Sequence, residues 1–314
     1  MSPGTVIALF GPTGVGKTAV AIALAERLRA RGERPVAVSA DALQVYRGLE
    51  ILTGAATSQE RRRLEHRLIS FLAVTETFSA GRYAELAHRE IDALVAQDAR
   101  PIVVGGTGLY LRAALADLDL APPPPAALRQ KWTERLEREG PASLHAELSR
   151  RAPQAADRLR PTDSQRLVRA LELAELDALP AHGTDSQLWT TETRHPTRLI
   201  GLTMQRVALR ARIDARVEAM VAAGAEDEVR AADAAGASPT ARSALGFAEL
   251  LAGDAEAMKR RTRQYARRQL TWMRKLPHVA LVDVTDRGAD DVAVELEKII
   301  DRDDRDRLGQ RGDA

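Results

Sequence analysis

The stretch Gly-Pro-Thr-Gly-Val-Gly-Lys-Thr at residues 11–18 constrains this chain more than any other feature. An apolar run, Val6–Phe10, precedes it, and an alanine-rich amphipathic stretch follows over residues 19–31. A strand, then Gly-x-x-x-x-Gly-Lys-Thr, then a helix is the local structure that a phosphate-binding loop requires. The sequence therefore predicts that something polyphosphorylated binds here.

Each position of this loop has a predicted part in holding phosphate. The glycines let the backbone bend until successive N–H groups point into one concavity at a helix N-terminus. Lys17 adds a mobile charge for the outer phosphate, and the Thr18 hydroxyl is placed to hold Mg²⁺. The predicted diphosphate- or nucleotide-binding residues are Gly11, Pro12, Thr13, Gly14, Val15, Gly16, Lys17 and Thr18. The loop alone leaves open whether the phosphates are transferred, hydrolysed or released as a leaving group.

Further short apolar runs predict the rest of a parallel sheet. Residues 34–40 read as a second strand that ends at Asp41, and residues 101–104 as a third. Because strand carboxyl ends border the ligand crevice in open α/β sheets, we expect Asp41 to face the phosphate loop. Its role stays open at this point, since it could cap the next turn or hold Mg²⁺ through water. The Gly-Gly-Thr turn at 105–107 is expected to line the same crevice.

The chain changes character at the proline run 122–125, which reads as a stiff connector. Helical patterns follow over 126–139, 142–150 and 163–177, and two more strands are expected at 198–202 and 279–284. We predict an α/β fold, a P-loop NTPase-like parallel sheet core with a helical insertion domain. The core spans 1–112 and 198–300, the insertion 113–197, and a disordered charged tail 301–314.

Composition excludes several classes of protein. The chain of 314 residues has no cysteine, which rules out disulfides, thiol catalysis and thiolate zinc sites. No apolar run approaches the roughly 20 residues that span a bilayer, and no signal peptide is visible at the N-terminus. With 45% hydrophobic and 29% charged residues it reads as an ordinary globular protein, expected in the cytoplasm and without a structural metal.

Two groups of basic residues predict anion binding. Arg212 and Arg216 are four apart and share one helix face, which suits a diphosphate clamp; a solvated face paired with Asp214 and Glu218 is equally compatible with the spacing. From Lys259 to Lys275 there are eight basic residues and no acidic one, with Tyr265 and Trp272 among them. The uniform sign and the interleaved aromatic residues favour a polyanion surface over a solvated helix face.

With these residues in view, the chain resembles the tRNA dimethylallyltransferases, or tRNA isopentenyltransferases, of the bacterial type. The resemblance covers most of residues 6–285 and rests on six motifs in the family's order. They are Gly-Pro-Thr-x-x-Gly-Lys-Thr at 11–18, Ser-Ala-Asp-x-x-Gln-Val-Tyr-Arg-Gly at 39–48, Val-Gly-Gly-Thr-Gly-Leu-Tyr at 104–110, Asp-x-Gln-Arg-x-x-Arg-Ala-Leu-Glu at 163–172, Arg-Ile-x-x-Arg-Val at 212–217 and Thr-Arg-Gln-Tyr-Ala-Arg-Arg-Gln-x-Thr-Trp at 262–272. One departure stands out, because the lysine that the family usually carries after the aspartate motif is missing from residues 52–56.

The resemblance implies a prenyl transfer from dimethylallyl diphosphate to N6 of adenosine 37, just 3′ of the anticodon, in tRNAs that read codons beginning with U. By the family's motifs, Asp41 is the general base, Thr107 helps place the amine, and Lys17 and Arg216 hold the diphosphate with Mg²⁺ at Thr18. The expected partners are tRNA and dimethylallyl diphosphate, with no membrane, for a chain acting as a monomer. The residues implied to contact tRNA are Asp41, Ala42, Leu43, Gln44, Thr107, Arg129, Gln165, Arg166, Leu167, Val168, Arg169, Ser243, Ala244, Leu245, Gly246, Phe247, Ala248, Arg267, Arg268, Gln269, Thr271, Trp272 and Arg274.

Three other functions remain possible from the sequence. Prenylation of free AMP, ADP or ATP is disfavoured by the helical insertion and the basic run, since a free nucleotide needs neither. A P-loop kinase or NTPase is disfavoured because no apolar strand ends convincingly in a second magnesium-binding aspartate, although Asp41 could mimic one. A non-catalytic RNA-binding protein is disfavoured by the intact set of Lys17, Thr18, Asp41 and Thr107.

Overall fold

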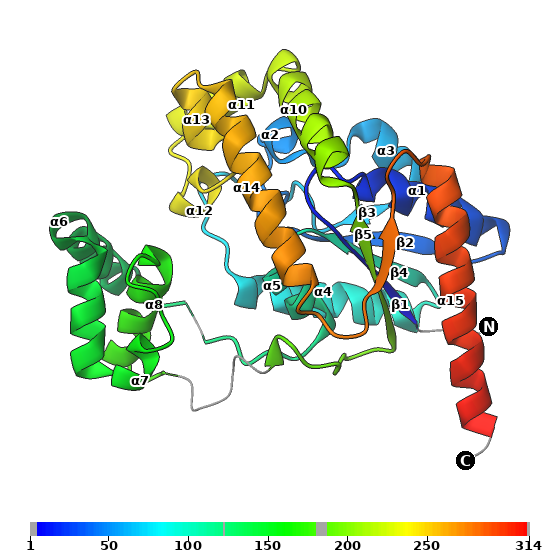
Figure 1. Ribbon diagram of the computed structural model, residues 1–314, viewed down its shortest axis with the longest axis horizontal. Coiled ribbons are helices and arrows are strands. Elements are labelled where there is room, and N and C mark those ends of the chain that lie inside the picture. Colours follow the sequence, from blue (N-terminus) through cyan, green and yellow to red (C-terminus); the bar gives the residue numbers. More distant parts are fainter. Residues whose placement is uncertain (1–4, 122, 180–186, 313–314) are drawn as a thin grey trace. The chain divides into compact units, whose positions relative to one another are not determined.

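Six parallel strands form one sheet, in the order β3–β2–β4–β1–β5–β6 (Figure 1). The computed structural model describes residues 5–121, 123–179 and 187–312, with residues 303–312 described by their backbone alone. The strands are β1 (Val6–Phe10), β2 (Pro35–Ala40), β3 (His66–Arg67), β4 (Arg100–Gly105), β5 (Thr197–Thr203) and β6 (Ala280–Asp283). The predicted α/β fold with a parallel sheet is therefore confirmed, and so are its five predicted strands.

The two-residue strand β3 was not predicted, because His66–Arg67 is polar and too short to show a period. By contrast, every residue of β1 and β2 is buried. Strands covered by helices on both faces read as continuous apolar runs, which is why the sequence predicts them well.

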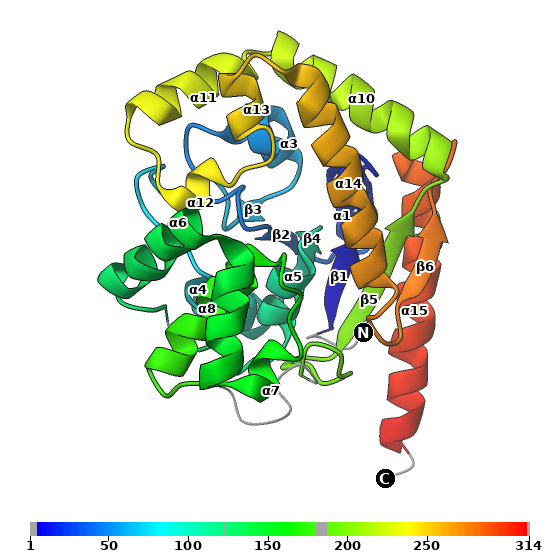
Figure 2. The same cartoon turned by 60° about the vertical axis from the view of Figure 1, so that its left-hand side comes forward.

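Helices cover both faces of the sheet. α1 and α15 pack together against β1, β2, β4 and β5, whereas α4 and α5 pack together on the other face (Figure 1). The later helices α10 to α14 gather beside the sheet (Figure 2). The helices of this part of the chain are α1 (Lys17–Ala30), α2 (Glu50–Thr53), α3 (Ser58–Arg63), α4 (Ala80–Ala96), α5 (Gly108–Leu115), α10 (Arg206–Ala222), α11 (Ala225–Ala234), α12 (Pro239–Arg242), α13 (Phe247–Leu251), α14 (Ala255–Met273) and α15 (Ala289–Gly312).

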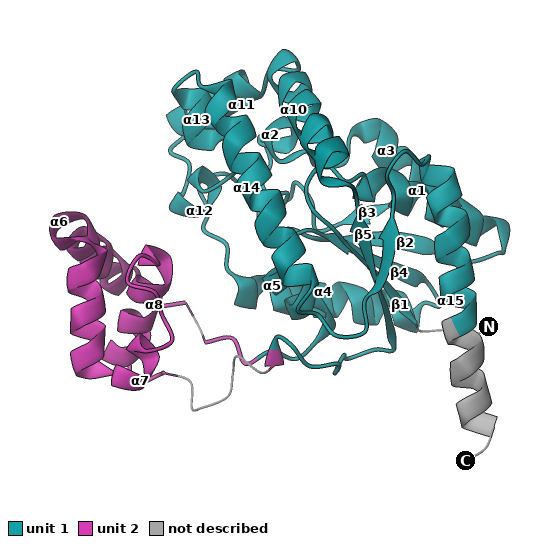
Figure 3. Cartoon of the chain, in the orientation of Figure 1, with its two compact units in different colours: residues 1–118, 188–314 teal, residues 119–187 magenta. Residues whose placement is uncertain are grey.

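The chain divides into two compact units (Figure 3). The first contains residues 1–118 and 188–314, and the second is the helical segment Asp119–Gln187. The second unit contains α6 (Ala126–Arg151), α7 (Pro153–Ala156) and α8 (Ser164–Glu175) around the fully buried Trp132. It starts later and ends earlier than the predicted insertion 113–197, because α5 continues to Leu115 and residues 188–197 belong to the first unit.

The C-terminal tail also differs from the expectation. The tail from residue 301, predicted to be disordered, continues α15 as helix to Gly312, and Asp301 accepts a hydrogen bond from Arg31 at 2.8 Å; residues 313–314 lie outside the described part. The short helices α12 and α13 are separate, and Gly246 between them has a φ of 97°. No helix in the described part of the chain is both long and apolar enough to cross a bilayer.

Candidate active site

The register of the sheet brings three predicted site segments to one edge. Ala40 at the end of β2 pairs with Gly105 of β4, and Gly105 also pairs with Phe10 of β1. Gly11, Asp41 and Gly106 therefore leave three adjacent strands at the same level. Neighbouring strands are about 4.8 Å apart, so Asp41 starts two strand spacings, roughly 10 Å, from the phosphate loop.

The phosphate loop opens α1 as the sequence predicts. Gly16 caps the helix with a φ of 100°, a conformation that favours glycine. In the described structure the backbone amides of Gly16, Lys17 and Thr18 have no hydrogen-bond acceptor, as expected at a helix N-terminus that binds an anion. Lys17 Nζ donates to the carbonyl oxygens of Gly11 at 2.9 Å and Pro12 at 3.0 Å, which holds its charge against the loop.

Asp41 caps the turn after β2, which is one of the roles that the sequence left open. Its Oδ1 accepts the N–H groups of Leu43 at 2.9 Å and Gln44 at 3.4 Å, so this oxygen caps the turn after β2. Its Oδ2 has no hydrogen-bond partner among the residues that the structure describes. One oxygen therefore fixes the carboxylate while the other is available to take a proton.

Asp41 attracts two cations, Lys17 of the phosphate loop and Arg216 of α10. Burial, followed by repulsion from Arg216, lowers the pKa of Lys17 to about 8, and attraction to Asp41 partly opposes this. Burial likewise lowers the pKa of Arg216, again opposed by Asp41. Two cations that repel each other and have lost water form a site whose natural occupant is a multiply charged anion.

The helix α10 carries the two arginines, Arg212 and Arg216, that the sequence predicts as a diphosphate clamp. Arg212 lies against the loop, since a Cβ placed on Gly16 would be 3.2 Å from its Nη2. Arg216 reaches Gly54, where a Cβ would be 1.7 Å from its Nη2, so it occupies the segment that lacks the family's usual lysine. The alternative that Asp214 and Glu218 neutralise these arginines is wrong, because Asp214 pairs with Arg263 and Glu218 with Lys259 on α14.

The second glycine turn presents a hydroxyl to this edge. Thr107 is the N-cap of α5, yet its side chain does not cap that helix. Its Oγ1 instead lies 3.0 Å from the hydroxyl of Tyr265 on α14. Burial, reinforced by Asp41, raises the pKa of Tyr265 to about 12, so Tyr265 stays neutral and able to donate at physiological pH.

Sequence reasoning did not place Tyr265 and Gln269 against the glycine-rich segments. Gln269 was assigned to tRNA but is 5% exposed and hydrogen-bonds the backbone of both glycine-rich segments. A signal was present in the helical period, because Thr262, Ala266, Gln269 and Met273 form the buried face of α14. A glutamine on such a face needs buried polar partners.

The remaining predicted tRNA contacts divide by burial. Five of them are buried in the protein, namely Leu167, Val168, Ala244, Gly246 and Phe247. Leu167 and Val168 pack with Trp132 in the core of the second unit. The exposed members are Gln165, Arg166, Ser243, Ala248, Arg267, Arg268, Thr271 and Arg274, and the half-buried ones are Asp41, Ala42, Leu43, Gln44, Thr107, Arg169, Leu245 and Trp272.

In the second unit, two of the predicted arginines share one carboxylate. Glu172 is fully buried and pairs with both Arg129 and Arg169. Arg169 also donates to the carbonyl of Ala121 at 2.9 Å. The buried acid holds both guanidinium groups in place, and guanidinium groups bind phosphate oxygens well.

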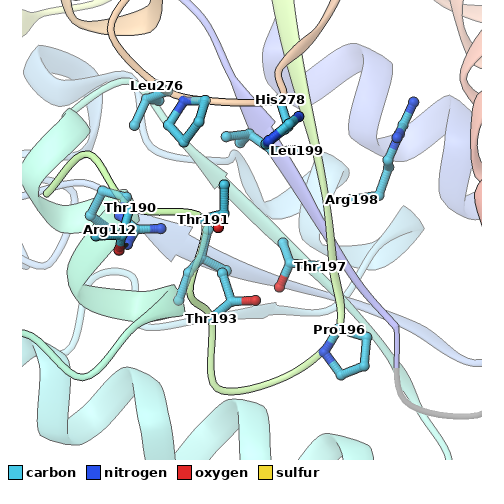
Figure 4. Close-up of a pocket in the computed structure, with 12 residues that line it drawn as sticks. Arg112, Thr190, Thr191, Thr193, Pro196, Thr197, Arg198, Leu199, Leu276 and His278 are labelled. Atoms are coloured by element: carbon cyan, nitrogen blue, oxygen red, sulfur yellow. Dashed lines mark hydrogen bonds between the residues drawn. The ribbon is translucent and has the colours of Figure 1, made fainter. Parts of the chain in front are cut away.

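A separate cavity of about 340 Å³ lies at the opposite end of β5. Its lining includes Arg112, Arg198, His278 and several threonines (Figure 4). Arg112 donates to Thr190 Oγ1 and to the carbonyl of Glu192, both at 3.2 Å. None of the predicted site residues lines this cavity, and it is distinct from the site at the strand carboxyl ends.

Comparisons with known proteins identify the family of this chain. The family model IPP transferase matches residues 44–276. A tRNA dimethylallyltransferase of Thermobifida fusca is 42% identical over 286 residues, covering 88% of each chain. The solved tRNA isopentenylpyrophosphate transferase of Bacillus halodurans is 31% identical, with a TM-score of 0.71 over 98% of this chain and 99% of that one. A solved eukaryotic dimethylallyltransferase acting on tRNA is 25% identical, with a TM-score of 0.69 over 90% and 74% of the two chains. The chain therefore belongs to the IPP transferase family of tRNA dimethylallyltransferases.

Proposed function

We propose that this protein transfers the dimethylallyl group of dimethylallyl diphosphate to N6 of adenosine 37 in tRNAs that read codons beginning with U. Family membership supports the reaction class. The observation that carries the proposal is that three segments meet at one edge of the sheet. There, a carboxylate with one unbonded oxygen lies near buried cations and a group of unpaired backbone amides.

The carboxylate of Asp41 activates the N6 amine of adenine, which is a weak nucleophile. The lone pair of an adenine amine is conjugated into the ring, so the amine attacks slowly without a base. As the N6–C1 bond forms, one N6 proton passes to Oδ2 of Asp41. A positioned base of this kind contributes roughly 10²–10⁴-fold to the rate. The hydroxyls of Thr107 and Tyr265, which form one hydrogen-bonded pair, orient the amine.

The cations and backbone amides stabilise the diphosphate leaving group. The C1–O bond breaks and its electron pair departs with diphosphate, while the allylic carbon carries positive character. Lys17, Arg216 and the N-terminal amides of α1 bind the oxygens on which that charge develops; the amides lack acceptors, and the two cations are buried and repel each other. They therefore bind the donor and also lower the barrier to its ionisation.

The residues present fit a magnesium ion bound largely through the diphosphate. The Thr18 hydroxyl makes no hydrogen bond to any described residue and is free to be a ligand. No three histidine, aspartate or glutamate side chains gather into a metal site in the described part of the chain. When bound, Mg²⁺ would neutralise diphosphate oxygens, with the substrate and water as its other ligands.

A competition assay tests the proposal. Purified protein is incubated with labelled dimethylallyl diphosphate, bulk tRNA and AMP, with Asp41→Asn as the inactive control. Label in tRNA that maps to adenosine 37 is expected. Label in AMP would indicate an adenylate isopentenyltransferase, ATP turnover without prenyl transfer a P-loop NTPase, and tRNA binding without label a non-catalytic RNA-binding protein.

A further inference from the structure

Gln269 connects the two glycine-rich segments of the pocket. Its Oε1 accepts the N–H of Thr13 at 2.8 Å, and its Nε2 donates to the carbonyl of Gly106 at 2.8 Å. We propose that Gln269 is a positioning residue, which holds the phosphate loop to the second glycine turn and thereby determines which amides bind the diphosphate. This inference rests on the proposed function.

Only some backbone amides of the phosphate loop are free to bind an anion. Because Thr13 already donates to Gln269, its amide is withdrawn from the anion nest, and the amide of Val15 donates to Pro12 at 3.3 Å. Within the described structure, the loop amides left without an acceptor are those of Gly14, Gly16, Lys17 and Thr18. The diphosphate is therefore bound at the helix end of the loop, and the Thr13 amide does not contact it.

The phosphate loop and the second glycine turn lie close together around Gln269. A Cβ on Gly106 would be 2.3 Å from Gln269 Nε2 and 3.0 Å from the carbonyl oxygen of Gly11, so the two turns approach closely around this amide. An amide side chain is required here, because one end must accept and the other must donate. A glutamate would keep the acceptor and lose the donor, and a methionine would leave both backbone groups buried without partners.

A second residue of α14, Tyr265, also contacts the glycine turn. Tyr265 precedes Gln269 by four residues, lies on the same helix face and bonds Thr107. One helix therefore fixes the phosphate loop, the glycine turn and the threonine, while Arg267 and Arg268 point outward from it. The position of the donor site follows from the position of the basic helix.

Amide hydrogen exchange on the unmodified protein tests the donor assignment directly. Inorganic diphosphate is the probe. The Thr13 amide is expected to exchange slowly before diphosphate is added and to stay unchanged afterwards, whereas the amides of Gly14, Gly16, Lys17 and Thr18 gain protection. Fast exchange at Thr13 that slows on adding diphosphate would overturn the proposal.

Variants test the positioning role, with an exposed glutamine of the same helix as the control. Gln269→Met is expected to raise the Kd for inorganic diphosphate and the KM for dimethylallyl diphosphate by about tenfold or more, and Gln269→Glu by a similar factor. The KM for tRNA should stay within about twofold, as should every constant in Gln264→Met and Gln264→Glu. A raised KM for tRNA with unchanged diphosphate binding would make Gln269 an RNA contact and reject the proposal.

The two proposals fail separately. Diphosphate binding is measured without tRNA or a prenyl group, so it tests Gln269 even if the unmodified protein prenylates no tRNA, a result that would reject only the proposed function. If the Gln269 variants do not fold, the exchange experiment on the unmodified protein decides.

Discussion

The two halves of α14 carry similar charges in the sequence and have different surroundings in the structure. In the N-terminal half, each basic residue has an acidic partner: Lys259 pairs with Glu218 and Glu256, Arg260 with Asp254, Arg261 with Glu249 and Arg263 with Asp214. In the C-terminal half and just beyond it, Arg267, Arg268, Arg274 and Lys275 are exposed and have no acidic partner among the described side chains.

The inward faces differ as well. The N-terminal half buries Met258 and Thr262, whereas the C-terminal half places Tyr265 and Gln269 against the glycine turn and the phosphate loop. A run of basic residues therefore splits into a structural half, which ties α14 to its neighbours, and a half that we propose to be functional, which has exposed charge on its outer side and contacts the pocket on its inner side. Uniform charge in a sequence does not imply a uniform role.

The largest effect is expected at Asp41, the carboxylate at the end of β2 whose charge helps to raise the pKa of Tyr265 in the functional half. Asp41→Asn keeps the shape of the side chain but removes the base, so we expect kcat to fall by about 10²–10⁴-fold. The Kd for tRNA should hardly change, because the carboxylate contributes little to backbone binding. Single-turnover prenyl transfer and a filter-binding assay measure the two quantities. A large loss of tRNA affinity with kcat preserved would remove Asp41 as the base.

Charge neutralisation tests the contrast between the halves directly. Arg267→Gln/Arg268→Gln should weaken tRNA binding by about tenfold or more at moderate salt and reduce the slope of log K against log salt by roughly 1.4 to 1.8. The matched pair Arg260→Gln/Arg261→Gln should change both much less, since acidic partners already compensate those charges. Titrations at several salt concentrations measure this, and equal effects of the two pairs would abolish the distinction.

The charge of Lys17 gives the pocket a pH dependence. Because its pKa is lowered to about 8, Lys17 is protonated below that pH and becomes neutral above it. The affinity for dimethylallyl diphosphate should therefore fall as the pH rises through 8, by up to about tenfold per unit. Lys17→Arg is the control, since a guanidinium keeps its proton while the ionisation of the ligand is common to both. Identical pH profiles for the two proteins would exclude Lys17 as the titrating group.

The smallest expected effect is on stability, in the structural half. Arg263→Met removes the partly buried pair with Asp214 while keeping most of the apolar stem, and should lower the free energy of unfolding by about 0.5–1 kcal/mol. The exposed Arg267→Met should change it by less than about 0.5 kcal/mol. Urea unfolding measures both, and a greater loss in Arg267→Met would contradict the assignment of the structural half.

Much of the fold followed from local patterns. The buried strands are short apolar runs, the phosphate loop carries its glycines and lysine at fixed spacing, and Asp163 caps α8 by accepting the Arg166 N–H. These features depend on residues close together in the chain, and elementary geometry is enough to read them. The helical end of the chain was missed, because its charged composition resembles a disordered segment and the pairing of Asp301 with Arg31 is not visible locally.

The sequence by itself determined the phosphate loop, the strand-end aspartate and the family, because motifs of fixed spacing encode a strand, a turn and a helix start. Only the tertiary structure decided which basic residues keep unpaired charge and which polar residue of α14 is buried. Gln269 and Thr13 are 256 positions apart, and no local pattern reports a contact at that separation. Burial and ion pairing are properties of neighbours in space, and the packing of α10 and α14 beside the sheet creates those neighbours.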